Sequence, residues 1–173
     1  MIVDGGSTAE MFAGMVPLRC SATFITHCPA TAVALATRSP AEIVLVGGRL
    51  DPFSRVAVGA SAVEAYSNIS ADLCVVGLSG INVSKGIYSP HYEESLVRAA
   101  MIDAANETVG LAITDKLGTG DAFNVAPATA LTHLAVDAEA PGELTRPFEE
   151  MGIRVLRPDT SNGHTAPQRR PDA

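Results

Sequence analysis

Short apolar runs of strand length alternate with segments of helical periodicity along most of this chain. Continuous apolar runs are typical of parallel strands that are covered on both faces, and their alternation with helices is typical of α/β domains. The expected strands are residues 2–3, 22–26, 43–46, 73–77, 109–114, 131–136 and 153–156. The expected helices are residues 7–15, 30–36, 60–67, 93–105 and 147–151. The sequence therefore predicts an α/β fold, an open, mostly parallel Rossmann-like sheet with helices on both faces.

Length and composition limit what such a chain can do. With 173 residues and a hydrophobic fraction of 47%, it suits one domain with one core. Its net charge of −7 disfavours DNA binding by this chain itself, so an anionic ligand needs a locally positive site. The three cysteines have no metal-binding spacing, and we expect no metal and no cofactor. We expect a cytoplasmic protein without a membrane segment.

The end of the chain differs in composition from the rest. Residues 158–173 are rich in proline and polar side chains and almost lack apolar ones. We therefore expect a folded domain over residues 1–157 and a disordered tail over residues 158–173.

The sequence Asp4-Gly5-Gly6-Ser7-Thr8 joins the first expected strand to the first expected helix. The glycines allow a sharp turn, and Ser7 and Thr8 stand where the helix begins, with free backbone N–H groups. Such a turn can bind phosphate, but it can equally be an ordinary strand-to-helix connection with nothing bound.

A set of further segments, in this order, resembles the C-terminal effector domain of DeoR-family transcription regulators. These are IVLVGGRL at 43–50, AVGA at 57–60, GLSGI at 77–81, GIYSP at 86–90, EE at 93–94, RAAMI at 98–102 and DKLG at 115–118. The resemblance runs from about Ile2 to Leu156. It implies a fold related to ribose-5-phosphate isomerase and the CoA-transferases, and a phosphorylated sugar or similar metabolite as small-molecule effector. It also implies that DNA is contacted only through a winged helix-turn-helix, which is absent from this chain; we further expect a homo-oligomer.

The carboxyl ends of parallel strands meet at one edge of a sheet, and the resemblance selects residues in the same loops. Ser7 and Thr8 are expected to hold phosphate, and Lys116 to neutralise ligand charge. Glu94 and Arg98 face the same way on a helix and match family positions, although they can also be an ordinary surface ion pair. The expected ligand-binding residues are Gly6, Ser7, Thr8, Thr26, His27, Gly47, Gly48, Ser79, Asn82, Lys85, Glu94, Arg98 and Lys116.

We expect no catalysis. Ribose-5-phosphate isomerase carries two carboxylates in the segment that corresponds to residues 77–82, where this chain has the neutral Ser79 and Asn82. Loss of a positioned acid or base typically costs roughly 10²- to 10⁴-fold in rate. The chain also departs from the DeoR pattern at His27, Ser79, Ile113 and Arg98. Three hypotheses remain: a sensor domain, an isomerase-like or CoA-transferase-like enzyme, and an oligomerisation module with a decayed site.

Overall fold

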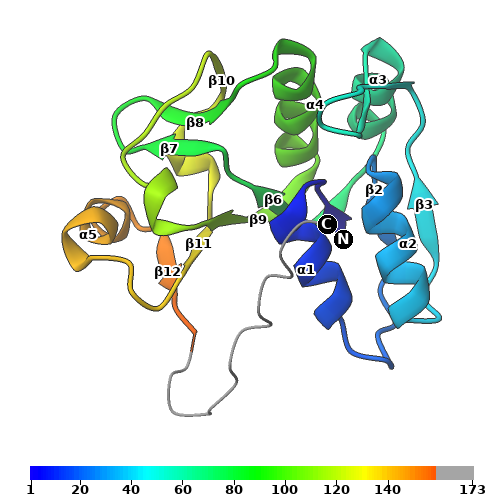
Figure 1. The fold of residues 1–173 in the computed structure, drawn as a ribbon, viewed down its shortest axis with the longest axis horizontal. Coiled ribbons are helices and arrows are strands. Elements are labelled where there is room, and N and C mark those ends of the chain that lie inside the picture. Colours follow the sequence, from blue (N-terminus) through cyan, green and yellow to red (C-terminus); the bar gives the residue numbers. More distant parts are fainter. Residues whose placement is uncertain (159–173) are drawn as a thin grey trace, which may run out of the picture.

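The structure is a computed structural model that describes residues 1–158. Its centre is a seven-stranded sheet in which every pair of neighbouring strands is parallel. Figure 1 shows β12, β11, β9 and β6 toward one side of the molecule and β2 and β3 toward the other. The predicted open parallel α/β sheet is therefore confirmed. The predicted tail, apart from Pro158, lies outside the described residues. The strands lie in the order β12 (Arg154–Leu156), β11 (His133–Val136), β9 (Ala105–Ala112), β6 (Ala71–Gly77), β1 (Ile2–Val3), β2 (Phe24–Thr26) and β3 (Ile43–Leu45).

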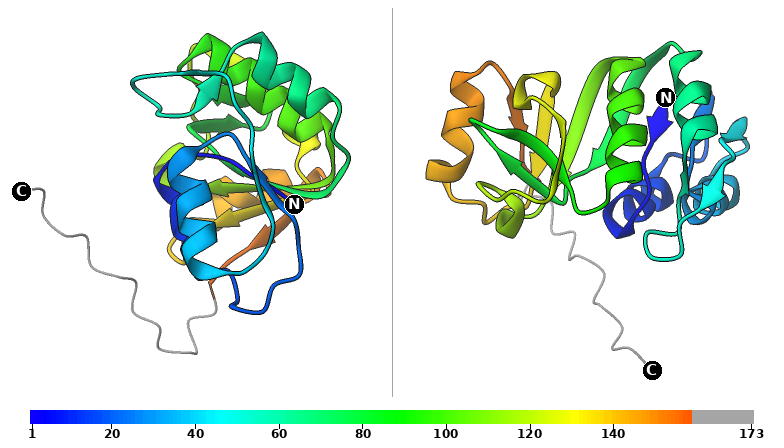
Figure 2. Two further views of the ribbon diagram at one scale, coloured as in Figure 1. Left: turned by 90° about the vertical axis from the view of Figure 1, so that its right-hand side faces the viewer. Right: turned by 90° about the horizontal axis from the view of Figure 1, so that it is seen from above.

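Helices cover both faces of the sheet (Figure 2). α1 (Ser7–Met15) and α2 (Pro29–Arg38) pack side by side on one face, while α3 (Ala60–Ser67) and α4 (Tyr92–Asp103) pack together on the other. α5 (Gly142–Glu150) lies beside the edge strand β12. The helices are held by small or apolar inward side chains: α1 buries Ala9 and Ala13, for example, so that it can approach the sheet closely.

The order of the strands places a topological switch point beside β1. From β1 the chain builds outward through β2 and β3, then crosses back to β6 on the other side of β1 and continues through β9, β11 and β12. The loops that follow β1 and β6 therefore leave the sheet in opposite directions and open a crevice between them. In open α/β sheets this crevice is the usual place for a ligand.

The sequence analysis missed two smaller sheets. β7 (Gly80–Asn82), β8 (Gly86–Ser89) and β10 (Phe123–Ala126) form an antiparallel sheet beside α4, and β4 (Arg49–Leu50) pairs with β5 (Ala57–Val58). These strands are only two to four residues long, too short to show a strand period in the sequence.

Several predicted boundaries were also wrong. β9 ends at Ala112, and residues 114–116 form a 3₁₀ turn, η1 (Thr114–Lys116), instead of continuing the strand. A second 3₁₀ turn, η2 (Ala128–Ala130), precedes β11. α5 begins at Gly142, five residues before the predicted start at Pro147.

Candidate functional site

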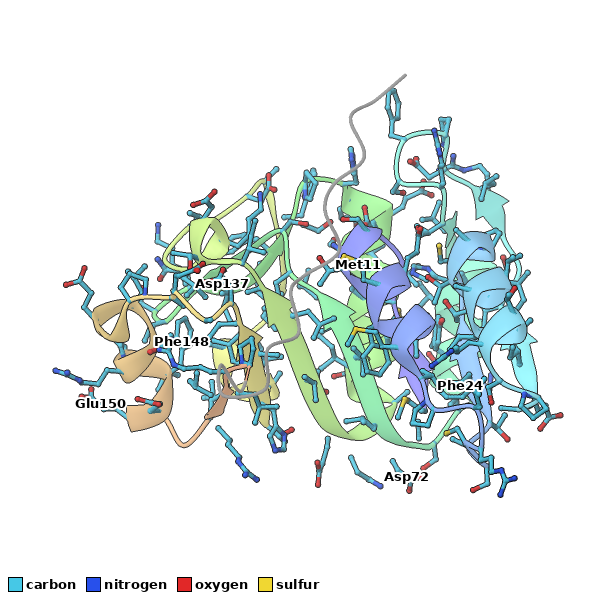
Figure 3. The ribbon with its side chains drawn as sticks, turned by 60° about the horizontal axis from the view of Figure 1, so that its bottom comes forward. Met11, Phe24, Asp72, Asp137, Phe148 and Glu150 are labelled. Carbon is cyan, nitrogen blue, oxygen red and sulfur yellow. The ribbon has the colours of Figure 1, made fainter. Side chains whose placement is uncertain are left out.

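A pocket of about 540 Å³ opens at the switch point, where the loops after β1, β6 and β9 meet the start of α1 and one side chain of α4. Figure 3 shows the edge of the sheet involved: Met11 of α1 and Asp137 lie toward it, whereas Asp72, near the start of β6, lies at the opposite edge. The residues that line the pocket are Gly5, Gly6, Ser7, Thr8, Met11, Gly77, Leu78, Ser79, Arg98, Ile113 and Lys116.

The first turn of α1 presents hydrogen-bond donors to this pocket. Gly6 precedes the helix with a φ of 90°, a left-handed conformation that favours glycine. The Glu10 N–H bonds to the Gly6 carbonyl at 2.9 Å, so the amides of Ser7 and Thr8 stand ahead of the first bond of the helix. No side chain that the structure describes caps this helix start. Two exposed hydroxyls, two amides and the positive end of the helix dipole therefore face the pocket.

Asp4, the last residue before the glycines, lies beneath the floor of the pocket and is completely buried. Its Oδ1 accepts hydrogen bonds from the Gly5 N–H at 2.7 Å and from His27 Nε2 at 3.0 Å. Its Oδ2 accepts from the Gly77 N–H at 3.1 Å and from Arg98 Nε at 3.0 Å. One carboxylate thus ties together the ends of β1, β2 and β6 and the middle of α4.

Burial raises the pKa of the Asp4 carboxyl, but Arg98 and the hydrogen bonds from His27 and Gly5 outweigh burial and lower the pKa to about 2. Asp4 is therefore ionised at neutral pH. Both of its oxygens already have two hydrogen-bond donors each, so its lone pairs are directed toward the protein and away from the pocket.

Arg98 connects this floor to the pocket wall. Its Nη2 donates to Glu94 Oε1 at 2.7 Å, and its Nη1 lies 3.4 Å from the Ser79 hydroxyl. Glu94 and Arg98 are both 6% exposed, so the alternative of an ordinary surface ion pair is wrong. Burial lowers the pKa of the Arg98 guanidinium, but the charges of Asp4 and Glu94 outweigh burial and raise the pKa. The guanidinium therefore stays protonated.

Lys116 reaches the pocket from η1, the 3₁₀ turn that follows β9. The turn is anchored at its first residue, because the Thr114 N–H and hydroxyl each donate to the Asp137 carboxylate at 2.6 Å. These bonds lower the pKa of Asp137, the residue that follows β11. Sequence reasoning missed Asp137. A carboxylate directly after an expected strand was the available signal.

The structure brings together six of the predicted site residues in the lining: Gly6, Ser7, Thr8, Ser79, Arg98 and Lys116. Glu94 lies behind Arg98. Sequence reasoning missed Asp4, although Asp4 belongs to the motif that drew attention to this turn. It also missed Met11 and Leu78, which form apolar wall together with Ile113.

The other predicted residues do not line this pocket. His27 is buried, and its ring lies between Asp4 and the Ala57 carbonyl, which is 2.9 Å from Nδ1. The buried Thr26 hydroxyl accepts the Cys28 N–H at 3.1 Å. Asn82 Nδ2 donates to the Gly118 carbonyl at 3.2 Å. The remaining three, Gly47, Gly48 and Lys85, are exposed outside the lining.

Comparison with known proteins shows the family to which this domain belongs. Residues 1–138 match the family described as the DeoR C terminal sensor domain. The chain belongs to that family. The resemblance inferred from the ordered sequence segments is therefore confirmed, and the pocket lies at the switch point of a DeoR sensor domain.

Curated relatives of this sensor domain are transcription regulators by name. It is 26% identical over 163 residues to the HTH-type transcriptional repressor GlcR of Bacillus subtilis, covering 94% of this chain and 62% of that protein. It is 24% identical to the HTH-type transcriptional regulator GlpR of Haloferax volcanii, covering 88% and 60% respectively. It is 19% identical to the putative aga operon transcriptional repressor of Escherichia coli O157:H7, covering 90% and 58%. The chain spans about three fifths of the length of these relatives.

Two further observations concern residues 1–158. They contain no group of three or more His, Cys, Asp or Glu side chains placed to hold a metal ion. None of their helices combines the length and the hydropathy that a membrane crossing requires.

Proposed function

We propose that this DeoR sensor domain binds a phosphorylated sugar or a related metabolite in the switch-point pocket and does not convert it. The observation that carries the proposal is the uncapped start of α1, whose amides and hydroxyls line the pocket opposite Lys116. Helix N-termini bind phosphate because unpaired N–H groups and the helix dipole both favour an anion. The lysine neutralises further ligand charge.

The absence of catalysis follows from the acid–base groups near the pocket. Enediol chemistry requires a base that removes a proton from carbon. Among the residues that the structure describes, those lining the pocket include no Asp or Glu. The Asp4 carboxylate lies beneath the floor with both oxygens engaged, so it is not available as a base. The site therefore fits a binder better than an isomerase or a CoA-transferase.

We assign DNA binding to a helix-turn-helix, because the relatives GlcR and GlpR are named an HTH-type transcriptional repressor and an HTH-type transcriptional regulator. The chain described here has a net charge of −7, which opposes the approach of a DNA phosphate backbone. Ligand binding at the switch point would then bias the DNA-binding part of a homo-oligomeric regulator.

A thermal-shift experiment tests the proposal. A phosphorylated sugar at millimolar concentration should raise the melting temperature, since a ligand that binds only the folded state stabilises it, and the unphosphorylated sugar should do much less. Thr8→Ala should abolish most of the shift while the protein stays folded, and Lys116→Ala should reduce the shift of ligands that carry charge beyond the phosphate. Lys85→Ala is the matched control, because Lys85 is exposed outside the pocket. A screen without any hit would favour the oligomerisation module with a decayed site.

A further inference from the structure

The pocket presents positive charge at two separate places. Ser7 and Thr8 follow β1, Ser79 follows β6, and Lys116 follows β9, and these three strands are consecutive neighbours in the sheet. Neighbouring strands lie about 4.8 Å apart, so the loops after β1 and β9 leave the sheet about 10 Å from each other. The start of α1 and the η1 turn can therefore contact opposite ends of a small ligand that lies across the end of β6.

The cation between these two places is already paired with two carboxylates. Arg98 is held by Asp4 and Glu94, so it offers the pocket a donor N–H without a free positive charge. Lys116, by contrast, makes no ion pair with any residue that the structure describes. The pocket thus has a helix N-terminus at one end and a lysine with no described carboxylate partner at the other.

The wall of the pocket is poor in strong acceptors. Its polar side chains are three hydroxyls, one guanidinium and one ammonium group, and the rest of the wall is apolar or glycine. The hydroxyl groups of a neutral polyol are donors as well as acceptors, and an Asp or Glu side chain would satisfy these donors best. A ligand carboxylate only accepts, and it forms its strongest hydrogen bonds with cationic donors such as Lys116.

We infer that the pocket takes a ligand with an anionic group at each end: a phosphorylated sugar acid, with its phosphate at the start of α1 and its carboxylate at Lys116. This inference rests on the proposed phosphate site and specifies its substrate class. Ile113, at 47% exposure, also lines the pocket and adds apolar surface three residues before Lys116.

The test uses pairs of compounds that differ in one group. 6-Phosphogluconate and sorbitol 6-phosphate share six carbons and one phosphate, but the first ends in a carboxylate and the second in a hydroxymethyl group. 3-Phosphoglycerate and glycerol 3-phosphate form the same pair with three carbons, so that ligand length does not decide the result. Titration calorimetry should show that the acid binds about tenfold or more tightly than the polyol in the pair that fits.

Three variants of the whole chain separate the two ends. Lys116→Gln should lower the affinity for the acid by about tenfold and leave the affinity for the polyol phosphate nearly unchanged, so that the preference for the acid disappears. Thr8→Ala should lower the affinity for both members of a pair to the same degree. Lys85→Gln removes the same charge from an exposed site outside the pocket and should change neither.

The contrary outcomes point to different errors. Equal binding of acid and polyol, or an equal loss of both in Lys116→Gln, would overturn the sugar-acid inference and leave the phosphate site standing. Failure of all four compounds to bind would overturn the phosphate site as well. Tighter binding of the polyol would also overturn the sugar-acid inference, because it would show that the pocket wall accepts hydrogen bonds from hydroxyl groups.

Discussion

Asp4 and Arg98 are 94 positions apart in the chain and meet as a buried ion pair, with Arg98 Nε 3.0 Å from Asp4 Oδ2. The pair joins the end of the central strand β1 to helix α4 directly below the pocket. It fixes the position of the pocket floor, because the same carboxylate also holds the end of β6.

Arg98→Met should destabilise the domain strongly. The substitution leaves Asp4 and Glu94 as two buried carboxylates without their common cation, and removal of one partner of a buried pair typically costs about 3–5 kcal/mol. Urea unfolding measures the loss. Arg19→Met is the control, since Arg19 is exposed and its loss should change the free energy of unfolding by less than about 0.5 kcal/mol. A loss below about 1 kcal/mol for Arg98→Met would contradict the role assigned to the pair.

Acid should weaken the fold through Asp4. Its folded-state pKa of about 2 lies below the ordinary value of 3.8, so the ionised carboxylate contributes stability above pH 3.8 that is lost as the pH falls toward 2. A difference of this size corresponds to about 2 kcal/mol. Carboxyl-carbon NMR can follow the titration of Asp4 individually. Titration of Asp4 at pH 3.8 or above would show that Arg98, His27 and the Gly5 N–H do not outweigh the effect of burial.

The sequence predicted most strands of the main sheet and the start of α1 because both depend on local signals. Long apolar runs mark buried parallel strands, and Gly6 followed by Ser7 marks a helix start. The pairing of Glu94 with Arg98 was also visible, since residues four apart share a helix face. The sequence did not show that this face of α4 is buried, because its burial depends on how α4 packs against β6. An ion pair four residues apart on a helix is more often exposed to solvent.

Two parts of the site had no local signal strong enough to reveal them. Asp4 stands beside glycines in a turn, a place where aspartate is common, and only the long-range contacts with Gly77 and Arg98 give it a role. The antiparallel sheet of β7, β8 and β10 consists of strands too short for a clear period. Its pairing is held by contacts between distant segments, such as Phe123 with Ser89.

Gly5→Ala should destabilise the domain, whereas Gly14→Ala should stabilise it slightly. A Cβ at Gly5 would collide with the Val56 side chain and lie 3.1 Å from Cys28 Cβ, inside a packed core. Overpacking of this kind costs about 1–3 kcal/mol. A Cβ at Gly14 meets nothing within 4 Å, and alanine in a helix gains roughly 0.5–1 kcal/mol over glycine. Melting temperatures that move in the same direction would contradict the packing described around Gly5.

Asp137→Ala should loosen the turn that carries Lys116. The substitution removes both hydrogen bonds from Thr114, so η1 loses its anchor while the core strands keep their packing. Hydrogen exchange should become faster at the amides of Thr114 and Lys116. The amides of β6 should remain as protected as before, and they serve as the control. Unchanged exchange at Thr114 would mean that the turn is held by its own 3₁₀ bonds.

The protein should not isomerise aldose phosphates even when it binds them. Removal of a proton from carbon needs a base within hydrogen-bond reach of the ligand, and Ser79 is neutral while Asp4 is engaged by four N–H groups beneath the floor. A coupled assay with ribose 5-phosphate should therefore stay at background. Exchange of solvent deuterium into the carbon next to the carbonyl is a more sensitive measure, because it detects proton removal without complete turnover. Turnover near one per second is an ordinary enzyme rate and would show that a base reaches the ligand after all.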